Sequence, residues 1–179
     1  MSEKYAPITD ADWPPEIADM MADFAGGLNV YRVMAHHPML LRAWAGLRDH
    51  IVHHSALMPD QREVVILRAG HRLQAEYEWA HHVSRARAVG MDNARINSIA
   101  GPIAAMKTPD AVLVTAVDGL IDHACLTAPA RVELEQLLGP QGVLDVIATV
   151  GFYSTLAYIV KSFDVPIDSH ITDISGPRA

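Results

Sequence analysis

The chain has 179 residues, of which 50% are hydrophobic and only 6% aromatic, and its formal net charge is -7. A chain of this length supports one hydrophobic core, and its many small aliphatic residues favour packed helices over a sheet. Because acidic residues outnumber basic ones and the arginines are scattered among them, the composition argues against binding to nucleic acid.

The single cysteine, Cys125, excludes an internal disulfide bond and a cysteine-based zinc site, and it is compatible with a reducing cytoplasm. Residues 1–16 are polar and contain prolines, unlike a secretory signal peptide. No segment shows the roughly 18 consecutive apolar residues expected of a membrane span. We therefore expect a cytoplasmic protein that binds neither membranes nor nucleic acid.

The spacing of apolar residues predicts helices along most of the chain. Two short helical segments precede Pro38, where an amphipathic helix begins that extends to about residue 57. Its apolar side is expected to be formed by Leu40, Leu41, Trp44, Leu47 and Ile51. Further helices are predicted over residues 59–74, 75–89, 92–100, 109–126, 128–139 and 140–163. Since no alternating strand pattern occurs, we predict an all-α fold of about seven or eight helices.

Residues 1–179 are predicted to form a single domain, with residues 1–14 and 165–179 as extended arms, because both ends are polar and contain prolines. The unbroken apolar block at residues 64–67 predicts that its helix is buried around most of its circumference. Segment 140–163 has apolar residues on nearly every face. Such a helix lies in the core or against another subunit, and for a chain of this size we expect a homo-oligomer.

Residues 74–82, QAEYEWAHH, place two carboxylates, two imidazoles and an indole inside an otherwise apolar helical region. Glu78 and His82 are four residues apart and therefore share one stripe of the predicted helix. If this helix and the preceding one form an antiparallel pair, Glu63 lies about level with His82, since both are roughly ten residues from the turn. The three side chains can then cluster, and a neighbouring carboxylate is expected to raise the pKa of His82 and prepare it to donate a proton.

Plainer interpretations of these residues remain open. A Glu and a His at this spacing often form a solvated pair, and Glu63 near a helix start can offset the helix dipole. His81 and His82 point in different directions around the helix, so we do not predict a metal site. His81 is expected to face solvent or another chain.

At these residues the sequence resembles the carboxymuconolactone decarboxylase family, which also contains the AhpD-type alkylhydroperoxidases. The resemblance covers most of the chain and is most specific in REVVILRAGHRLQAEYEWAHHVSRARAVGM, residues 62–91. It implies an all-helical, AhpD-like fold with a central antiparallel helix pair. It also implies a homo-oligomer built from trimeric units, a trimer or a hexamer, in which helices of neighbouring subunits help to enclose the pocket.

The peroxidase branch of the family has the motif C-x-x-C-x-x-x-H with an upstream glutamate. When its histidine is placed on His82, the two cysteines fall on Ala75 and Glu78 and the glutamate on Glu63. Dithiol chemistry needs a thiolate and a resolving thiol, and Cys125 stands alone in another helix. We therefore do not expect a thiol peroxidase.

The decarboxylase branch has E-x-x-x-H at this place, which matches Glu78 and His82, and its later tyrosine falls on Tyr153. The resemblance implies a cofactor-free lyase that acts on a small unsaturated carboxylated lactone or a related metabolite. Lys161 departs from the asparagine that similar sequences often carry, which leaves the substrate end of the pocket open.

The expected roles rest on proton transfer to the anion that remains when CO2 leaves a conjugated carbon. We expect His82 to deliver the proton, Glu78 to orient and charge the imidazole, and Glu63 to relay or tune it. The substrate-binding residues are expected to be Tyr153, which would donate to the oxyanion, Arg32, which would hold a carboxylate, and His36, which would contribute to specificity.

Three other functions compete with this one. An isomerase, hydratase or ring-opening lyase would use the same Glu and His. A non-catalytic helical oligomer would use the three side chains as a buried polar network that fixes the packing of subunits. A residual peroxidase would depend on Cys125 and would be lost on alkylation of its thiol.

Overall fold

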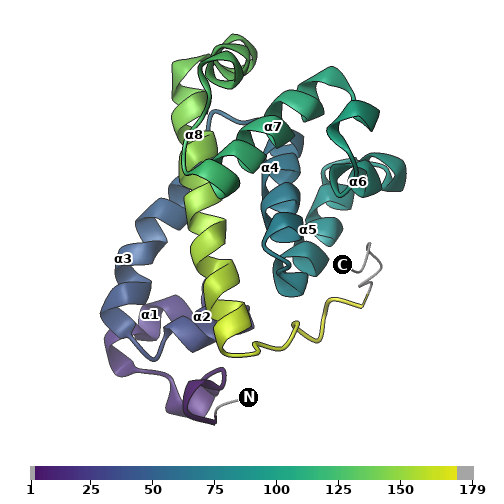
Figure 1. Ribbon diagram of the computed structural model, residues 1–179. Coiled ribbons are helices and arrows are strands. Elements are labelled where there is room, and N and C mark those ends of the chain that lie inside the picture. Colours follow the sequence, from purple (N-terminus) through teal and green to yellow (C-terminus); the bar gives the residue numbers. More distant parts are fainter. Residues whose placement is uncertain (1–2, 173–179) are drawn as a thin grey trace.

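The computed structural model describes residues 3–172, and the regular structure within this range consists of helices alone (Figure 1). The α-helices are α1 (Ala18–Met21), α2 (Asn29–Met34), α3 (Pro38–Asp49), α4 (Pro59–Arg72), α5 (Glu76–Ala88), α6 (Asn93–Ile99), α7 (Thr108–His123) and α8 (Ala128–Ser162). A π-helical turn, His50–His54, prolongs α3, and 3-10 turns lie at Glu3–Tyr5, Asp10–Asp12, Pro15–Ile17 and Ile103–Ala105. The prediction of an all-α fold is confirmed.

Helix α4 lies at the centre of the molecule and packs against α5, α7 and α8 (Figure 1). Helix α5 follows it after a short turn at residues 73–75 and returns antiparallel to it, as predicted. The side chains of the block at residues 64–67 are at most 1% exposed, so their predicted burial is confirmed. A helix enclosed by three others must be apolar on most of its faces.

The core consists of two hydrophobic clusters, and the α4–α5 pair contributes to both. Ile66 and Tyr77 belong to a cluster with α2, α3 and the end of α8. Leu67 and Val83 belong to a second cluster with α6, α7 and the earlier part of α8. The residues of the QAEYEWAHH motif therefore lie where the two clusters meet.

Helix α8 consists of two helices joined at a break. Gly139 has φ 72° and ψ 174°, a conformation that favours glycine because any side chain would be strained there. Pro140 follows it and begins the second part, where proline is tolerated because the first N–H groups of a helix have no partner in it. The predicted division into segments 128–139 and 140–163 is thus present as a break within α8.

By length and composition alone, helix α8 could also cross a membrane. No segment of that kind was predicted from the sequence. Its most apolar window is 56% buried within the fold. The core helix of a soluble protein has the same properties, because it must be apolar toward the helices that surround it.

Helix α3 buries less of its predicted apolar side than expected. Leu41 and Ile51 are at most 1% exposed, but Leu40 is 44% and Leu47 is 42% exposed. Leu40 and Leu47 are seven residues apart and share a stripe that points away from the core, because α3 lies at the edge of the molecule (Figure 1).

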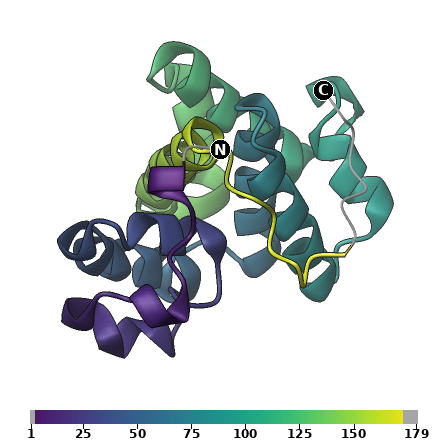
Figure 2. The ribbon, with the colours of Figure 1, turned by 90° about the horizontal axis from the view of Figure 1, so that it is seen from below.

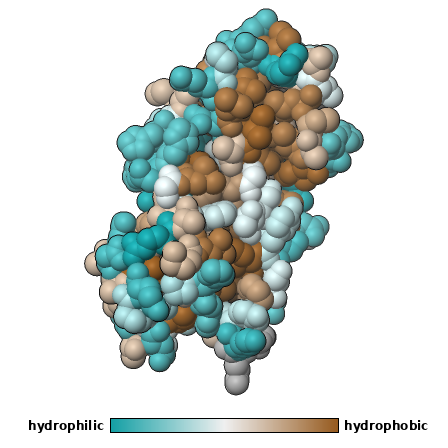
Figure 3. Space-filling view, turned by 90° about the vertical axis from the view of Figure 1, so that its left-hand side faces the viewer, coloured by the Kyte–Doolittle hydropathy of each residue, from teal (hydrophilic) through white to brown (hydrophobic). Residues whose placement is uncertain are grey.

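Exposed apolar residues gather on one side of the molecule (Figure 3). Helix α8 contributes Leu144, Ile147 and Tyr158 to the exposed apolar surface, each 41% exposed or more. Leu144 and Ile147 are three residues apart, and Tyr158 follows Ile147 by eleven residues, about three helical turns, so all three lie near one face of the helix. The homo-oligomer expected from the sequence stays a prediction, for which this face is the natural candidate.

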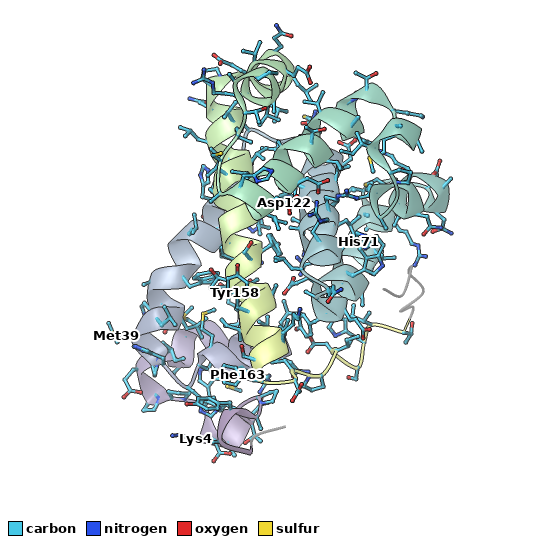
Figure 4. The ribbon with its side chains drawn as sticks, in the orientation of Figure 1. Lys4, Met39, His71, Asp122, Tyr158 and Phe163 are labelled. Atoms are coloured by element: carbon cyan, nitrogen blue, oxygen red, sulfur yellow. The ribbon has the colours of Figure 1, made fainter. Side chains whose placement is uncertain are left out.

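The two end segments pack against the helices. Residues 3–14 carry two 3-10 turns within extended backbone. Tyr5 stacks on Phe163, with ring centroids 4.3 Å apart. Phe163 directly follows α8 and is labelled in Figure 4. Residues 165–172 have no helix and cross below the α4–α5 turn (Figures 1 and 2). The remainder of the predicted C-terminal arm, 173–179, and residues 1–2 of the N-terminal one lie outside the described residues.

Ion pairs fix α7 on α4. The Arg68 guanidinium, which is 7% exposed, donates two hydrogen bonds to Asp118, at 2.8 and 2.6 Å. One turn further, Arg72 donates to Asp122 at 2.6 Å, and Figure 4 shows Asp122 on the side of α7 that faces α4. Bidentate contacts of this kind hold the two helices in register, which keeps α4 in place as the support of α5.

Candidate functional site

Glu63 and His82 face each other across the α4–α5 pair. The chain reverses through Gln74, whose φ is 53°, and the two helices approach closely at Gly70. A Cβ at Gly70 would lie 3.4 Å from the Cβ of Glu78, so a larger residue there would crowd the helix that carries the motif. The Glu63 Oε2 lies 2.6 Å from the His82 Nδ1, and both residues are at most 3% exposed. The structure therefore brings together the two residues that the helix arithmetic placed at one level.

Glu78 completes the cluster but with an unexpected protonation state. Its Oε2 is 3.9 Å from the His82 Nε2, and its Oε1 is buried without a hydrogen-bond partner among the described residues. Burial raises the pKa of Glu78 to about 8, although the nearby positive charge of Arg85 opposes the shift. At neutral pH Glu78 is thus mainly an uncharged acid, not the ionised partner that the sequence predicted.

His82 is correspondingly uncharged. Burial lowers its pKa below the ordinary value and outweighs the opposing influence of Glu63, so the expectation of a raised His82 pKa is corrected. In the neutral ring, the Nδ1–H donates to the Glu63 carboxylate, which leaves the Nε2 as the unprotonated nitrogen on the side of Glu78. A basic nitrogen and a protonated carboxyl group therefore stand next to each other.

These groups border a pocket between α2, α5 and α8. The space inside it, its open mouth included, is about 250 Å³. The lining residues are Leu28, Val30, Tyr31, Tyr77, Glu78, His81, His82, Arg85, Tyr153 and Leu156. The lining combines apolar side chains with a few ionisable and hydroxyl groups, the kind of lining found in binding sites for small molecules.

Two tyrosines supply hydroxyl groups to the pocket. Tyr153 meets the His82 ring edge to face, with centroids 4.9 Å apart and planes at 89°. Burial raises the pKa of Tyr153 well above its usual value and that of Tyr31 to about 12. Both side chains therefore remain phenols that can donate a hydrogen bond to a developing oxyanion. Tyr153 lines the pocket, and its role in binding substrate stays a prediction.

Arg85 is a pocket residue that the sequence reasoning missed. It is half-buried in the pocket wall and has no ion pair or hydrogen bond with any residue in the range 3–172. Its positive charge lowers the pKa of Glu78, His82 and Tyr153, which places it close to all three. The signal was present, since Arg85 follows Glu78 by seven residues and so shares its stripe of the helix.

The structure does not bring Arg32 and His36 to the pocket, and their predicted placement is corrected. Arg32 binds the N-terminal segment, donating to the carbonyl oxygens of Gly26 and Ile8 at 2.8 Å and to Asp10 at 2.6 Å. The His36 ring nitrogen lies 2.8 Å from the Ala6 carbonyl oxygen. Both side chains bind the N-terminal segment, residues 3–14. These contacts join residues far apart in the sequence, so no local sequence pattern predicts them.

Lys161 and His81 also lie elsewhere than the sequence suggested. The Lys161 ammonium donates to the Leu73 carbonyl oxygen at 2.7 Å and so caps the end of α4 instead of lining the pocket. His81 was expected at the surface but is 4% exposed and contributes to the pocket wall. Within the described part of the chain, no three His, Cys, Asp or Glu side chains are grouped so that they could hold a metal ion.

Comparisons with known proteins give a match over the part of the chain that carries the cluster. The model of the carboxymuconolactone decarboxylase family matches residues 38–117, which include α4, α5 and all three cluster residues. No match was found among curated proteins.

Similar solved structures extend the likeness to nearly the whole chain. One is the alkylhydroperoxidase AhpD core of Ralstonia eutropha JMP134, an uncharacterized peroxidase-related protein, with TM-score 0.79, 14% identity, and coverage of 98% of this chain and 97% of that one. Another is an uncharacterized peroxidase-related protein of Silicibacter sp. TM1040, with TM-score 0.78, 13% identity and 97% coverage of both chains.

A third similar structure is a cysteine-to-alanine variant of the debrominase Bmp8 in complex with 2,3,4-tribromopyrrole, with TM-score 0.75, 15% identity and 94% coverage of both chains. At such identities the structural likeness shows the fold alone, whereas the family model matches the sequence itself. The sequence is thus similar to the carboxymuconolactone decarboxylase family over residues 38–117, and the whole chain has the fold of the AhpD-like proteins.

Proposed function

We propose that the chain is a cofactor-free lyase of the carboxymuconolactone decarboxylase type, which removes CO2 from a small unsaturated carboxylated lactone or a related metabolite. One observation carries the proposal. An uncharged imidazole and a protonated carboxyl group, His82 and Glu78, stand 3.9 Å apart in the wall of a small pocket. Such a pair can accept and donate protons near neutral pH without any cofactor.

The proposed reaction starts with cleavage of the bond between the carboxylate carbon and the ring. The electron pair of that bond enters the conjugated lactone system, and CO2 leaves. Hydroxyl groups of Tyr31 and Tyr153 support the resulting enolate oxygen, because both remain protonated in the pocket. The substrate thus serves as its own electron sink.

Proton transfer completes the reaction. The Glu78 carboxyl group gives its proton to the enolate carbon and becomes a carboxylate. A proton from solvent restores Glu78 by way of the His82 Nε2, so that one proton is consumed for each CO2 released. Glu63 keeps the Nδ1–H of His82 fixed by the 2.6 Å hydrogen bond and favours the transient imidazolium. In this proposal Glu78 takes the donor role that the sequence reasoning gave to His82.

Arg85 replaces Arg32 as the proposed anchor of the substrate. It is the pocket arginine without a protein partner in the described residues, so its donors are free for a carboxylate of the substrate that does not react. This proposal requires the substrate to be an anion.

The same pair of groups also suits an isomerase that moves a proton between two carbons of an unsaturated lactone. The observation in its favour is that a base and an acid stand side by side: His82 is neutral and can accept a proton, whereas Glu78 is protonated and can donate one. A proton shift requires both. The two reactions differ in release of CO2, which the decisive experiment therefore has to measure.

The experiment is to incubate the purified protein with γ-carboxymuconolactone and related lactones, record CO2 release, and identify products by proton NMR in D2O. The proposal expects CO2 release with one deuterium incorporated at the protonated carbon. His82→Gln and Glu78→Gln should each lower turnover about 100-fold or more, as loss of a general acid or base does. The matched control, Glu76→Gln, removes an exposed carboxylate from the same helix and should retain full turnover.

Three results would contradict the proposal. One is an isomerised lactone without CO2, another is turnover within about tenfold of wild type in folded His82→Gln protein, and the third is a well-folded wild type that converts none of the carboxylated lactones.

We also propose that the chain forms a homo-oligomer through the exposed apolar face of α8 that carries Leu144, Ile147 and Tyr158. Burial of this face in a second copy would remove apolar surface from water, which favours association. Size-exclusion chromatography with light scattering tests this, and Leu144→Glu should shift the mass toward that of the monomer. If Leu144→Glu leaves the mass of an oligomer unchanged, this face is not the interface.

A further inference from the structure

One buried carboxylate joins the C-terminal segment to two walls of the pocket. Asp168 is 7% exposed although residues 165–172 form no helix. Its Oδ1 accepts a hydrogen bond from the backbone N–H of Asn29, at 3.0 Å, where α2 begins. Its Oδ2 accepts one from the Tyr77 hydroxyl on α5 and lies 2.9 Å from the His81 Nε2. Asp168 therefore bridges α2 and α5.

Tyr77 makes the second half of this connection. Its hydroxyl group donates to Asp168 and accepts from the backbone N–H of Val30, at 3.3 Å. Asn29 and Val30 are the first two residues of α2, and the first N–H groups of a helix have no partner within it. Side chains from distant parts of the chain satisfy both groups here. Asp168 and Tyr77 thus form a clasp between α2 and α5.

The clasp spans a part of the pocket that helix packing does not fix. Helix α2 contributes Val30 and Tyr31 to the pocket, and α5 contributes Glu78. However, α2 packs mainly against α3 and α8. It has only 6 residues, and a helix that short depends on contacts with the rest of the chain. The hydrogen bonds of the clasp are therefore expected to hold the α2 wall at its place opposite α5.

We infer that Asp168 is a positioning residue, which through the clasp holds Tyr31 over Glu78 and so keeps water away from the proton donor. The catalytic meaning of this inference rests on the proposed function, in which the Glu78 carboxyl group donates the proton. Tyr31 is 5% and Glu78 3% exposed, and both line the pocket. They are also close neighbours, because the charge that Glu78 carries at high pH raises the pKa of Tyr31.

Burial is what keeps Glu78 protonated. The ionisable groups around it are Tyr31 of α2, Tyr77, His82 and Arg85 of α5, Tyr153 of α8 and, bound to the far nitrogen of His82, Glu63 of α4. The charge that acts on the pKa of Glu78 is that of Arg85, and it lowers this pKa, whereas burial raises it. If the α2 wall moves away, water reaches the carboxyl group and its pKa falls toward the ordinary value.

Hydrogen exchange of the Asn29 and Val30 amides, measured by NMR, tests the clasp without a substrate. Asp168→Ala removes the acceptor of the Asn29 N–H, and Tyr77→Phe removes that of the Val30 N–H but keeps the ring. We expect each amide to exchange about fivefold faster or more, as loss of one hydrogen bond predicts. The change should exceed that of amides in α7, which report a general loss of stability. Ser169→Ala, at the exposed position next to Asp168, is the control and should leave both rates unchanged.

The ionised fraction of Glu78 tests the positioning role. ¹³C spectra of protein labelled at the glutamate carboxyl groups measure this fraction, and Glu78→Gln identifies the signal. Because its pKa is about 8, roughly a tenth of Glu78 is ionised at pH 7 in wild type. In Asp168→Ala and in Tyr77→Phe we expect about half or more, since water stabilises the carboxylate. Ser169→Ala should match wild type.

Faster exchange at the start of α2 together with a larger ionised fraction of Glu78 would support the inference. Unchanged exchange in both folded variants, or exchange that rises equally in α7, would overturn the clasp. Faster exchange with an unchanged ionised fraction would overturn the positioning role, because the clasp would then contribute to stability alone. If Asp168→Ala does not fold, Tyr77→Phe decides. Neither measurement needs a substrate, so a failure to release CO2 from any lactone would contradict the proposed function alone.

Discussion

Replacing Glu78 with glutamine should remove a pH dependence of stability that the buried carboxyl group imposes on the fold. Burial raises the pKa of Glu78 from 4.5 to about 8, so between these values the folded chain keeps a proton that the unfolded chain has released. Stability therefore falls as pH rises through this range. The contribution is fully present below pH 4.5 and is lost as pH passes about 8.

The magnitude follows from proton counting in the window from pH 6.5 to about 8. Below pH 6.5 the lowered pKa values of His82 and His71 have the opposite effect on the free energy of unfolding. In that range the unfolded chain binds protons at these histidines that the folded chain does not bind, so stability rises with pH. Within the window one proton per chain gives a slope of roughly 1 kcal/mol per pH unit, so wild type should lose between about 1 and 2 kcal/mol. Glu78→Gln should show almost no slope.

Urea unfolding at half-unit steps of pH, at one protein concentration, measures these free energies. Glu76→Gln is the control, because its exposed carboxylate is lost without any change at the pocket, and it should retain the wild-type slope. Equal slopes in wild type and Glu78→Gln would show that Glu78 is ionised at neutral pH, and the proposed proton donor would then be wrong.

Three further changes test the remaining roles. Glu63→Gln should lower kcat about 100-fold with little change in KM, because the 2.6 Å bond that fixes the His82 ring loses its charge; steady-state kinetics would contradict this if KM alone rose. Arg85→Met should raise KM for a carboxylated lactone about tenfold and affect kcat less, and an unchanged KM would remove the proposed anchor. Cys125→Ser, and alkylation of the exposed Cys125 thiol in wild type, should leave turnover unchanged, whereas a loss would favour thiol chemistry.

The helix pair could be predicted because only local rules are needed. A periodic apolar pattern defines each helix, a short connection makes neighbouring helices antiparallel, and a constant rise per residue gives the level of each side chain. Applied to Glu63 and His82, these rules brought together atoms that the structure places 2.6 Å apart. The position of Arg85 in the pocket follows from the same rules, because Arg85 lies on the same stripe of α5 as Glu78. On this helix the prediction named only carboxylates and imidazoles and therefore omitted it.

The partners of Arg32, His81 and Asp168 depend on contacts between distant parts of the chain. Arg32 binds carbonyl groups of residues 8 and 26, and Asp168 reaches Tyr77 across 91 positions. No periodicity records such contacts, because irregular segments have no repeating geometry. Arg32 was therefore predicted to line the pocket, whereas it binds the N-terminal segment.

The protonation of the Glu78–His82 pair could not be derived from spacing, and the reason bears on function. When a glutamate and a histidine stand four residues apart on a solvated helix, each charged form stabilises the other. The pKa of the imidazole is then raised and that of the carboxyl group is lowered. Here burial reverses both shifts. The cover that buries them includes Tyr31 on α2 and Tyr153 on α8, outside the motif itself. The same E-x-x-x-H motif on an uncovered α5 would hold an ionised acid and a charged imidazole, so the packing of α2 and α8 decides which of the two groups can donate the proton.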